Sequence, residues 1–76
     1  MAPPRRILIR TATIELGALL KWTGLAPTGG EAKRLIQRGR VSVNGEAEQR
    51  RGRRLHPGDR VDVDGQALLI ERTGPS

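Results

Sequence analysis

The stretch that decides the fold lies just before the middle of the chain and reads Thr28-Gly29-Gly30-Glu31-Ala32-Lys33-Arg34-Leu35-Ile36-Gln37-Arg38-Gly39. Thr28 and Glu31 have the spacing of a capping box, in which each side chain hydrogen-bonds an unpaired backbone N–H at the start of a helix. Gly39 stands where a left-handed residue commonly ends a helix. The stretch therefore predicts a helix of about ten residues between Thr28 and Gly39.

The predicted helix has one apolar face and one basic face. At about 100° per residue, four residues share the narrow face that can be buried: Ala32, Leu35, Ile36 and Gly39. The opposite arc carries Lys33, Arg34, Gln37 and Arg38. The helix N-terminus offers free N–H groups, and Gly29 and Gly30 leave it open to a phosphate. An ordinary surface helix with solvated cations explains the same pattern, so the helix alone does not decide its function.

The positive charge of the chain is concentrated in one segment. Between Lys33 and Arg54 there are eight cations and two anions, while the other residues carry six of each. This segment therefore accounts for the whole formal net charge of +6. Twelve of the fourteen cations are Arg, whose guanidinium binds phosphate through two hydrogen bonds and stacks on bases. The concentration indicates a phosphate-bearing partner.

Size and composition exclude several classes of function. The 76 residues form one small domain, which buries only about 60% of the surface of its unfolded chain and has no room for a deep catalytic cavity. The absence of Cys excludes disulfides and thiolate metal sites, and we expect no cofactor and no metal ion. No apolar run is long enough for a membrane span or a signal peptide. We expect a cytoplasmic monomer with no membrane partner.

The first half of the chain predicts a pair of helices. Residues 14–22 form the first helix of the prediction, and Gly24 is its C-terminal stop. Pro27 disfavours helical geometry at the residue before it, so the chain breaks there and restarts at Thr28. Trp22 borders the apolar face of the first helix. We expect it to pack in the core, and stacking on a base is the alternative.

The second half predicts strands joined by tight turns. Val41-Ser42-Val43 alternates with period two, Asn44-Gly45 is a strong hairpin signal, and residues 46–50 fit the return strand. Further strands are predicted at residues 60–63 and 66–71, with Asp64-Gly65 as the turn between them.

Together these elements predict an α+β fold, in which a two-helix hairpin packs on a small, curved, mostly antiparallel sheet. Residues 7–9 fit an edge strand of that sheet. The expected domain covers residues 7–72, after a flexible basic leader at residues 1–6 and before a tail at residues 73–76.

No pattern that carries enzyme chemistry is complete. Residues 62–65 resemble part of a calcium loop, but Arg60 stands where an acidic ligand is required. His56 has no Ser, Cys or carboxylate arranged for nucleophilic catalysis, and it fits a turn residue. Glu46 and Glu48 adjoin a block of cations and are expected to temper its charge. We therefore expect that the chain is not an enzyme.

That block, Arg50-Arg51-Gly52-Arg53-Arg54, is predicted to be a loop with little packing to lose. A solvated charge run, or protection of an edge strand, is the alternative. Its position close in sequence to the basic helix and the Asn-Gly turn favours a binding role.

These motifs resemble the S-four RNA-binding domain, also called the α-L motif. The resemblance rests on Leu19-Leu20-Lys21, Gly24-Leu25, residues 28–33, Ile36, Gly39 and residues 41–45. Residues 50–55 and 57–61 narrow it to the small stand-alone bacterial members, the YbcJ/YaaA-like group. The likeness covers residues 14–63.

The resemblance implies binding to structured RNA, with ribosomal and transfer RNA as candidate classes, through the second helix, its preceding loop and nearby cations. Carried across by position, the RNA-binding residues are Lys21, Thr28, Gly29, Lys33, Arg34, Arg38, Arg50, Arg51, Arg53 and Arg54. Two rivals stay open: an adaptor that docks an acidic protein, and a non-specific DNA binder.

Overall fold

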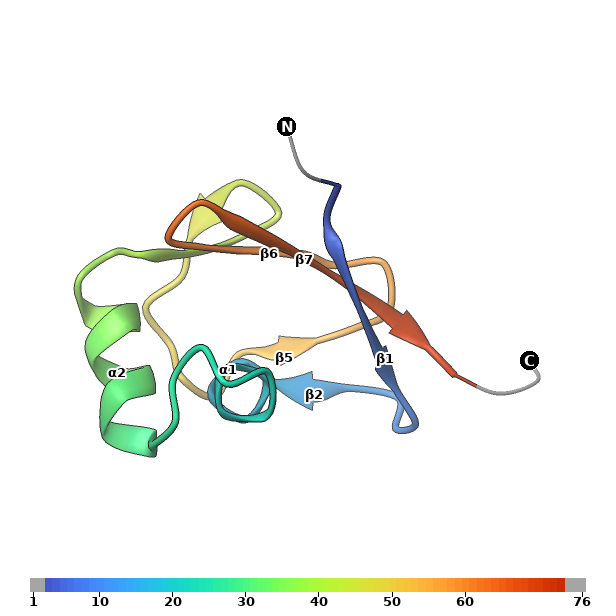
Figure 1. The fold of residues 1–76 in the computed structure, drawn as a ribbon, viewed down its shortest axis with the longest axis horizontal. Helices are drawn as coiled ribbons and strands as arrows, with labels where there is room; N and C mark the ends of the chain where they lie inside the picture. Colours follow the sequence, from blue (N-terminus) through green and yellow to red (C-terminus); the bar gives the residue numbers. More distant parts are fainter. Residues whose placement is uncertain (1–2, 74–76) are drawn as a thin grey trace.

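A five-stranded sheet forms one layer of the structure, and two helices lie on one side of it (Figure 1). The computed structural model describes residues 3–73. In chain order the elements are β1 (Arg5–Ile9), β2 (Ile14–Glu15), α1 (Leu16–Trp22), α2 (Gly29–Gln37), β3 (Val41–Val43), β4 (Glu46–Ala47), β5 (Arg54–Leu55), β6 (Arg60–Val63) and β7 (Gln66–Arg72). The predicted α+β fold is confirmed.

The main sheet has the strand order β1-β7-β6-β3-β4. The pairing of β1 with β7 is parallel, and the other pairings are antiparallel. The two short strands β2 and β5 pair separately, beside α1. The prediction of a mostly antiparallel sheet with residues 7–9 at its edge is therefore confirmed.

The hydrophobic core lies between the sheet and the helices. Every second residue of β3 and β6 is buried, and so are the apolar residues of both helices that were expected to face inward, apart from the half-buried Leu35 and the exposed Trp22. The buried side chains include Ile7, Ile9, Leu16, Leu19, Leu20, Ala32, Ile36, Val41, Val43, Val61, Val63, Leu68 and Ile70. This continuous core fixes α1 and α2 against the same sheet and leaves their outer arcs in solvent.

Both predicted hairpin turns have the left-handed backbone that their sequences favour. Asn44 and Gly45 have φ angles of 52° and 86°, and Asp64 and Gly65 have 49° and 83°. Two successive residues with positive φ form the turn that matches the twist of a two-residue hairpin. These turns set the register of β3 with β4 and of β6 with β7.

The boundaries of three predicted elements were wrong. Ile14 and Glu15 form strand β2 instead of the first turn of a helix, because their backbone pairs with Leu55 and Arg54. The return strand β4 ends at Ala47, because Glu48 turns inward and is buried. Strand β1 starts at Arg5, within the predicted leader.

At both ends part of the prediction falls outside the described residues: residues 1–2 of the leader and residues 74–76 of the tail. Thr73 belongs to the predicted tail, yet its N–H donates to the carbonyl of Ile9 at 2.9 Å. Within residues 3–73, no helix has the length and apolar character needed to cross a membrane.

Candidate nucleic-acid interface

Helix α2 starts and ends where the sequence predicts. The Thr28 hydroxyl accepts a hydrogen bond from the N–H of Glu31 at 3.1 Å, and Gly39 has a φ angle of +71°. Only the Thr28 half of the capping box is formed, because the Glu31 carboxylate is turned towards the Arg34 guanidinium, at 3.8 Å. That pair is exposed and contributes little stability. The cap fixes the helix, and Lys33, Arg34 and Arg38 are exposed to solvent.

The N-terminus of α2 is sterically open. A Cβ built on Gly29 would meet no atom within 4 Å, and one on Gly30 would meet only the Thr28 hydroxyl, at 3.8 Å. Packing therefore does not require glycine at either position. The absence of side chains leaves the first N–H groups of a nine-residue helix accessible to an anion.

The arginine loop, residues 50–53, caps helix α1 with its backbone. The N–H of Leu16 donates to the carbonyl of Arg53, and that of Gly17 donates to the carbonyl of Arg51, both at 2.9 Å. Glu15, the N-cap residue, makes no capping bond with its side chain. The loop carbonyls thus satisfy N–H groups that a helix start leaves unpaired. The loop backbone is consequently part of the fold, while the side chains of Arg50 and Arg51 are exposed.

This arrangement places Arg51 between the two helices. Arg51 lines a pocket of about 260 Å³ with Lys21, Gly29, residues of the first turn of α1 and one acid, the N-cap residue Glu15. It also lines a neighbouring pocket of about 210 Å³ with Lys33 and Gln37 of α2. Residues 30 positions apart in sequence therefore share one surface. We call this surface, made by Lys21, Gly29, Lys33 and Arg51, the interhelical basic face.

Gly17 makes the close approach of Arg51 possible. A Cβ at position 17 would lie 2.6 Å from Cγ of Arg51 and 3.4 Å from its carbonyl oxygen. The first distance is shorter than carbon atoms tolerate, so a side chain there would displace Arg51. Glycine ordinarily weakens a helix, and the role of Gly17 depends on a contact 34 positions away in the sequence.

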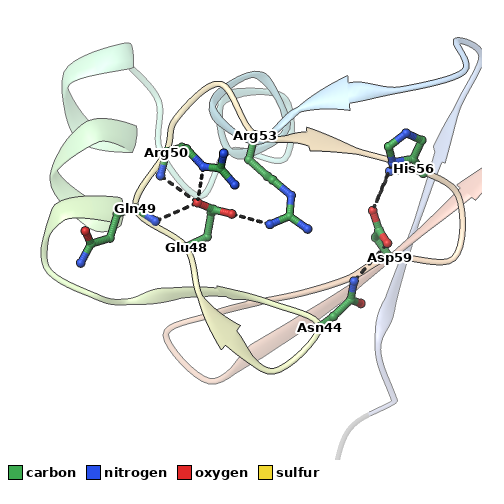
Figure 2. Close-up of polar contacts among 7 residues, drawn as sticks. All are labelled: Asn44, Glu48, Gln49, Arg50, Arg53, His56 and Asp59. Atoms are coloured by element: carbon green, nitrogen blue, oxygen red, sulfur yellow. Dashed lines mark hydrogen bonds and ion pairs between the residues drawn. The ribbon is translucent and has the colours of Figure 1, made fainter.

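Glu48 is a buried anchor beneath the arginine loop (Figure 2). Its carboxylate accepts hydrogen bonds from the N–H groups of Gln49 and Arg50 at 3.1 and 3.0 Å. It also pairs with the guanidinium groups of Arg50 at 3.2 Å and Arg53 at 2.5 Å. The expectation that Glu48 tempers the cationic block agrees with these contacts, but its burial was not predicted. Glu48 was expected to lie within the return strand, but that strand ends one residue earlier, at Ala47.

The ionised form of Glu48 is strongly favoured. Burial by itself raises the pKa of this carboxyl, but the hydrogen bonds from Arg50 and Arg53 outweigh burial and lower the pKa from 4.5 to about 2. At neutral pH the carboxylate is therefore charged and holds both guanidinium groups.

The predicted RNA-binding residues fall into three groups. Lys21, Gly29, Lys33 and Arg51 come together on the interhelical basic face. Arg34 in α2, Arg38 at its C-cap, Arg50 in the loop and Arg54 in β5 are exposed and line neither of these two pockets. Thr28 and Arg53 have structural partners: Thr28 caps α2, and the half-buried Arg53 is paired with Glu48.

The prediction that Trp22 packs in the core was wrong, because 60% of its surface is exposed. Leu16, Leu19 and Leu20 fill the buried side of the seven-residue helix α1, and Trp22 follows on its outer arc. The sequence placed Trp22 at the border of the apolar face, where the period of the helix does not decide its direction.

His56 is a turn residue, as expected. Its N–H donates to the Asp59 carboxylate at 2.7 Å, and Asn44 donates to the same carboxylate at 3.1 Å (Figure 2). These contacts tie the turn at residues 56–59 to the first hairpin. Within residues 3–73, no group of three or more His, Cys, Asp or Glu residues is placed to hold a metal ion.

This chain is similar to known proteins in sequence and in fold. A family model described as the S4 domain matches residues 7–71. The probable ribosome maturation protein RlbA of Bacillus subtilis (strain 168) is 43% identical over 65 residues, which are 86% of this chain and 89% of that protein. The crystal structure of the 30S ribosomal protein S4e of Thermoplasma acidophilum aligns with a TM-score of 0.65 at 17% identity.

This last alignment covers 84% of the chain and 40% of the ribosomal protein, so the chain spans less than half the length of that neighbour. At this low identity the likeness concerns the fold alone. The family match covers most of the chain, including α2 and the arginine loop. The chain therefore belongs to the S4 domain family.

Proposed function

We propose that this chain is a non-enzymatic module that binds structured RNA, with the interhelical basic face as its centre. The observation that carries the proposal is the position of Arg51, which lines one pocket with Lys21 and Gly29 and the next with Lys33. A phosphate at this junction reaches side chains from two helices and a loop. The exposed cations of α2 and β5 extend the same charge along the path of a nucleic-acid backbone.

Shape and phosphate contacts account for recognition at this face better than base stacking. The four residues of the interhelical basic face include no aromatic side chain. Sheet-based readers of single-stranded RNA use two or three aromatic residues, and this chain has one in total. The open N-terminus of α2 supplies backbone N–H groups, which contact phosphate without reading sequence.

Ribosomal RNA is the class of RNA that we propose. The support is the 43% identical relative, whose name describes it as a probable ribosome maturation protein. The identity extends over most of both chains, so we extend the ribosomal role in that name to this chain. Sequencing the RNA that co-purifies with the tagged protein tests this point, and an absence of ribosomal RNA above the background of an untagged control would contradict it.

The two rivals, an acidic protein partner and duplex DNA, are separated from RNA by competition at matched salt. A structured RNA, a DNA duplex of the same length and an acidic polypeptide are titrated against a labelled RNA hairpin. We expect the RNA to compete best. Equal competition by the DNA duplex would favour a non-specific nucleic-acid binder, and stronger competition by the polypeptide would favour the adaptor.

The salt dependence of binding tests the mechanism directly. Each neutralised phosphate gives a slope of about −0.7 to −0.9 in a plot of log K against log salt concentration. With about four to six contacts we expect a slope near −3 to −5. An adaptor that buries apolar surface would give a much shallower slope, and a slope near zero would contradict phosphate docking.

A further inference from the structure

Two large apolar side chains are exposed beside the edge strand of the sheet. Trp22 at the end of α1 is 60% exposed, and Leu8 in β1 is 50% exposed. The two residues together line two neighbouring pockets, of about 290 and 350 Å³. The five-residue strand β1 is the first strand of the sheet order. We call this surface, made by Leu8 and Trp22 with its flanking cations Arg5 and Arg10, the Trp22 face.

The charged residues that line the two pockets of the Trp22 face are cations, and the acid Glu71 lies opposite Leu8 on the neighbouring strand β7. Arg5 and Arg6 line the first pocket, and Arg10 lines the second. Arg6 is engaged with Glu71 at 2.8 Å, whereas Arg5 donates at 3.5 Å to the carbonyl of Thr23, the residue after Trp22. Arg5 and Trp22 therefore line the same pocket. A planar partner that also carries negative charge fits this combination.

The Trp22 face continues the interhelical basic face around helix α1. Ala18 and Lys21, which line the pocket containing Arg51, are exposed, as is Trp22. At about 100° per residue, Trp22 lies about 40° around the helix from Ala18. Trp22 therefore follows the pocket residue Ala18 on the outer surface of α1, about 100° around the helix from Lys21.

We propose that an unpaired nucleotide of the bound RNA stacks its base on Trp22, with adjacent phosphates held by Lys21 and Arg5. This inference rests on the proposed function and extends it: the structured part of the RNA occupies the interhelical basic face, and a flanking single strand occupies the Trp22 face. The RNA recognised is then a helix or hairpin next to unpaired nucleotides. A base offers a flat surface of the size of the indole ring, and stacking tolerates any of the four bases.

The test compares three RNA probes with the same hairpin stem: one with blunt ends, one with a short oligoadenylate extension at either end, and one with the same extension made abasic. We expect the extended hairpin to bind more tightly than the blunt one. The abasic extension retains its phosphates and loses its bases, so it should restore only part of the gain. Equal affinity for the adenylate and abasic extensions would overturn stacking.

Trp22 also reports on its own surroundings, because it is the only Trp in the chain. The extended hairpin should quench its fluorescence strongly, while the blunt and abasic probes should quench it weakly. Quenching by an acidic peptide and by none of the RNA probes would overturn the proposal in favour of a protein partner at this face.

Variants separate this inference from the proposed function. Trp22→Ala should weaken binding of the extended hairpin about 5- to 150-fold, the usual range for removal of one stacked base, and leave the blunt hairpin unaffected. Trp22→Phe should retain most of the affinity. Equal reductions for both hairpins would show a structural role and overturn the inference. If the unmodified protein binds neither hairpin, the proposed function fails, and this inference fails with it.

Discussion

Gly17 and Arg51 are in contact although 33 residues separate them in the sequence. The N–H of Gly17 donates to the carbonyl of Arg51 at 2.9 Å, and Cγ of Arg51 lies 2.6 Å from the point where a Cβ of residue 17 would be. One contact thus caps helix α1 and sets the direction of the arginine that joins the two pockets of the interhelical basic face. The folding of α1 and the placement of Arg51 are therefore linked.

Gly17→Ala tests this link. In an unhindered helix, Gly→Ala raises the free energy of unfolding by up to about 1 kcal/mol. Here the new methyl group overlaps Arg51, so we expect the free energy of unfolding to fall by about 1–2 kcal/mol, as in other overpacked sites. Affinity for a structured RNA should fall too, because Arg51 must move. Urea unfolding and RNA titration measure the two effects.

Gly30→Ala is the matched control, since Gly17 and Gly30 are each the second residue of their helix. A Cβ at position 30 makes only an ordinary contact at 3.8 Å. We expect this variant to be more stable than the unmodified protein by about 0.5–1 kcal/mol. If the two variants changed stability by the same amount and in the same direction, the contact between Gly17 and Arg51 would have no energetic role.

The cap of α2 gives a second prediction. Thr28→Ala removes the hydroxyl that accepts the N–H of Glu31 at 3.1 Å, and the usual loss of stability for an N-cap is about 1 kcal/mol. Thr28→Ser keeps the acceptor and should restore most of the stability. Thermal unfolding of the three proteins measures this, and an unchanged melting temperature for Thr28→Ala would contradict the helix start.

Local signals in the sequence predicted most of the fold. These signals affect only the few residues around them: Thr28, Gly39, the Asn-Gly turn and the Asp-Gly turn. The structure confirms each of them. The start of α1 could not be predicted in the same way. It depends on backbone bonds from the arginine loop to Leu16 and Gly17, and on the pairing of β2 with β5. These contacts join residues 34 to 41 positions apart and leave no local pattern.

The sequence indicated which segment carries the candidate site, but it did not indicate which arginines are exposed at the site and which are held within the fold. Charge density pointed to residues 33–54, and Arg51 and Lys33 do share a surface there. The sequence could not show that Arg53 is held by a buried Glu48 while Arg51 is directed between the helices. Neighbouring arginines look alike in sequence, and only the direction of each side chain distinguishes them.

The different environments of Arg51 and Arg53 give a third prediction. Arg51→Ala should leave the melting temperature within a few degrees, as surface substitutions do. It should also weaken RNA binding and reduce the salt slope by about one unit for each phosphate that the variant no longer neutralises. Arg53→Ala should lower the free energy of unfolding by about 1–3 kcal/mol, because it removes a hydrogen bond to a buried charge.

Arg60→Ala is the control for both, since Arg60 pairs with Asp62 at 3.3 Å on the sheet and lines none of the pockets of the interhelical basic face. It should change neither RNA affinity nor stability appreciably. An Arg51→Ala protein that binds RNA at full strength with an unchanged salt slope would show that the loop cation is only solvated, and it would leave α2 as the site.

The last prediction concerns acid. The pKa of Glu48 is about 2 in the folded chain, and its ordinary value is 4.5. As the pH falls, Glu48 is therefore protonated in the unfolded chain at a higher pH than in the folded chain. The contribution of Glu48 to stability is therefore complete above about pH 5 and disappears as the pH falls towards 2. We expect stability to decrease by about 2–3 kcal/mol over that window, the free-energy equivalent of the shift with an allowance for the exposed Arg50.

Glu48→Gln isolates this contribution, because the amide has nearly the same shape and carries no charge. The variant should be less stable than the unmodified protein by about 2–3 kcal/mol at pH 7, and the two curves should converge as the pH approaches 2. Asp59 and Glu71 also have lowered pKa values, but they titrate in both proteins and cancel in the difference. Urea unfolding between pH 7 and pH 2 gives the two curves. A gap that stays constant across this range would mean that Glu48 stabilises the arginine loop through packing, and that its charge contributes nothing.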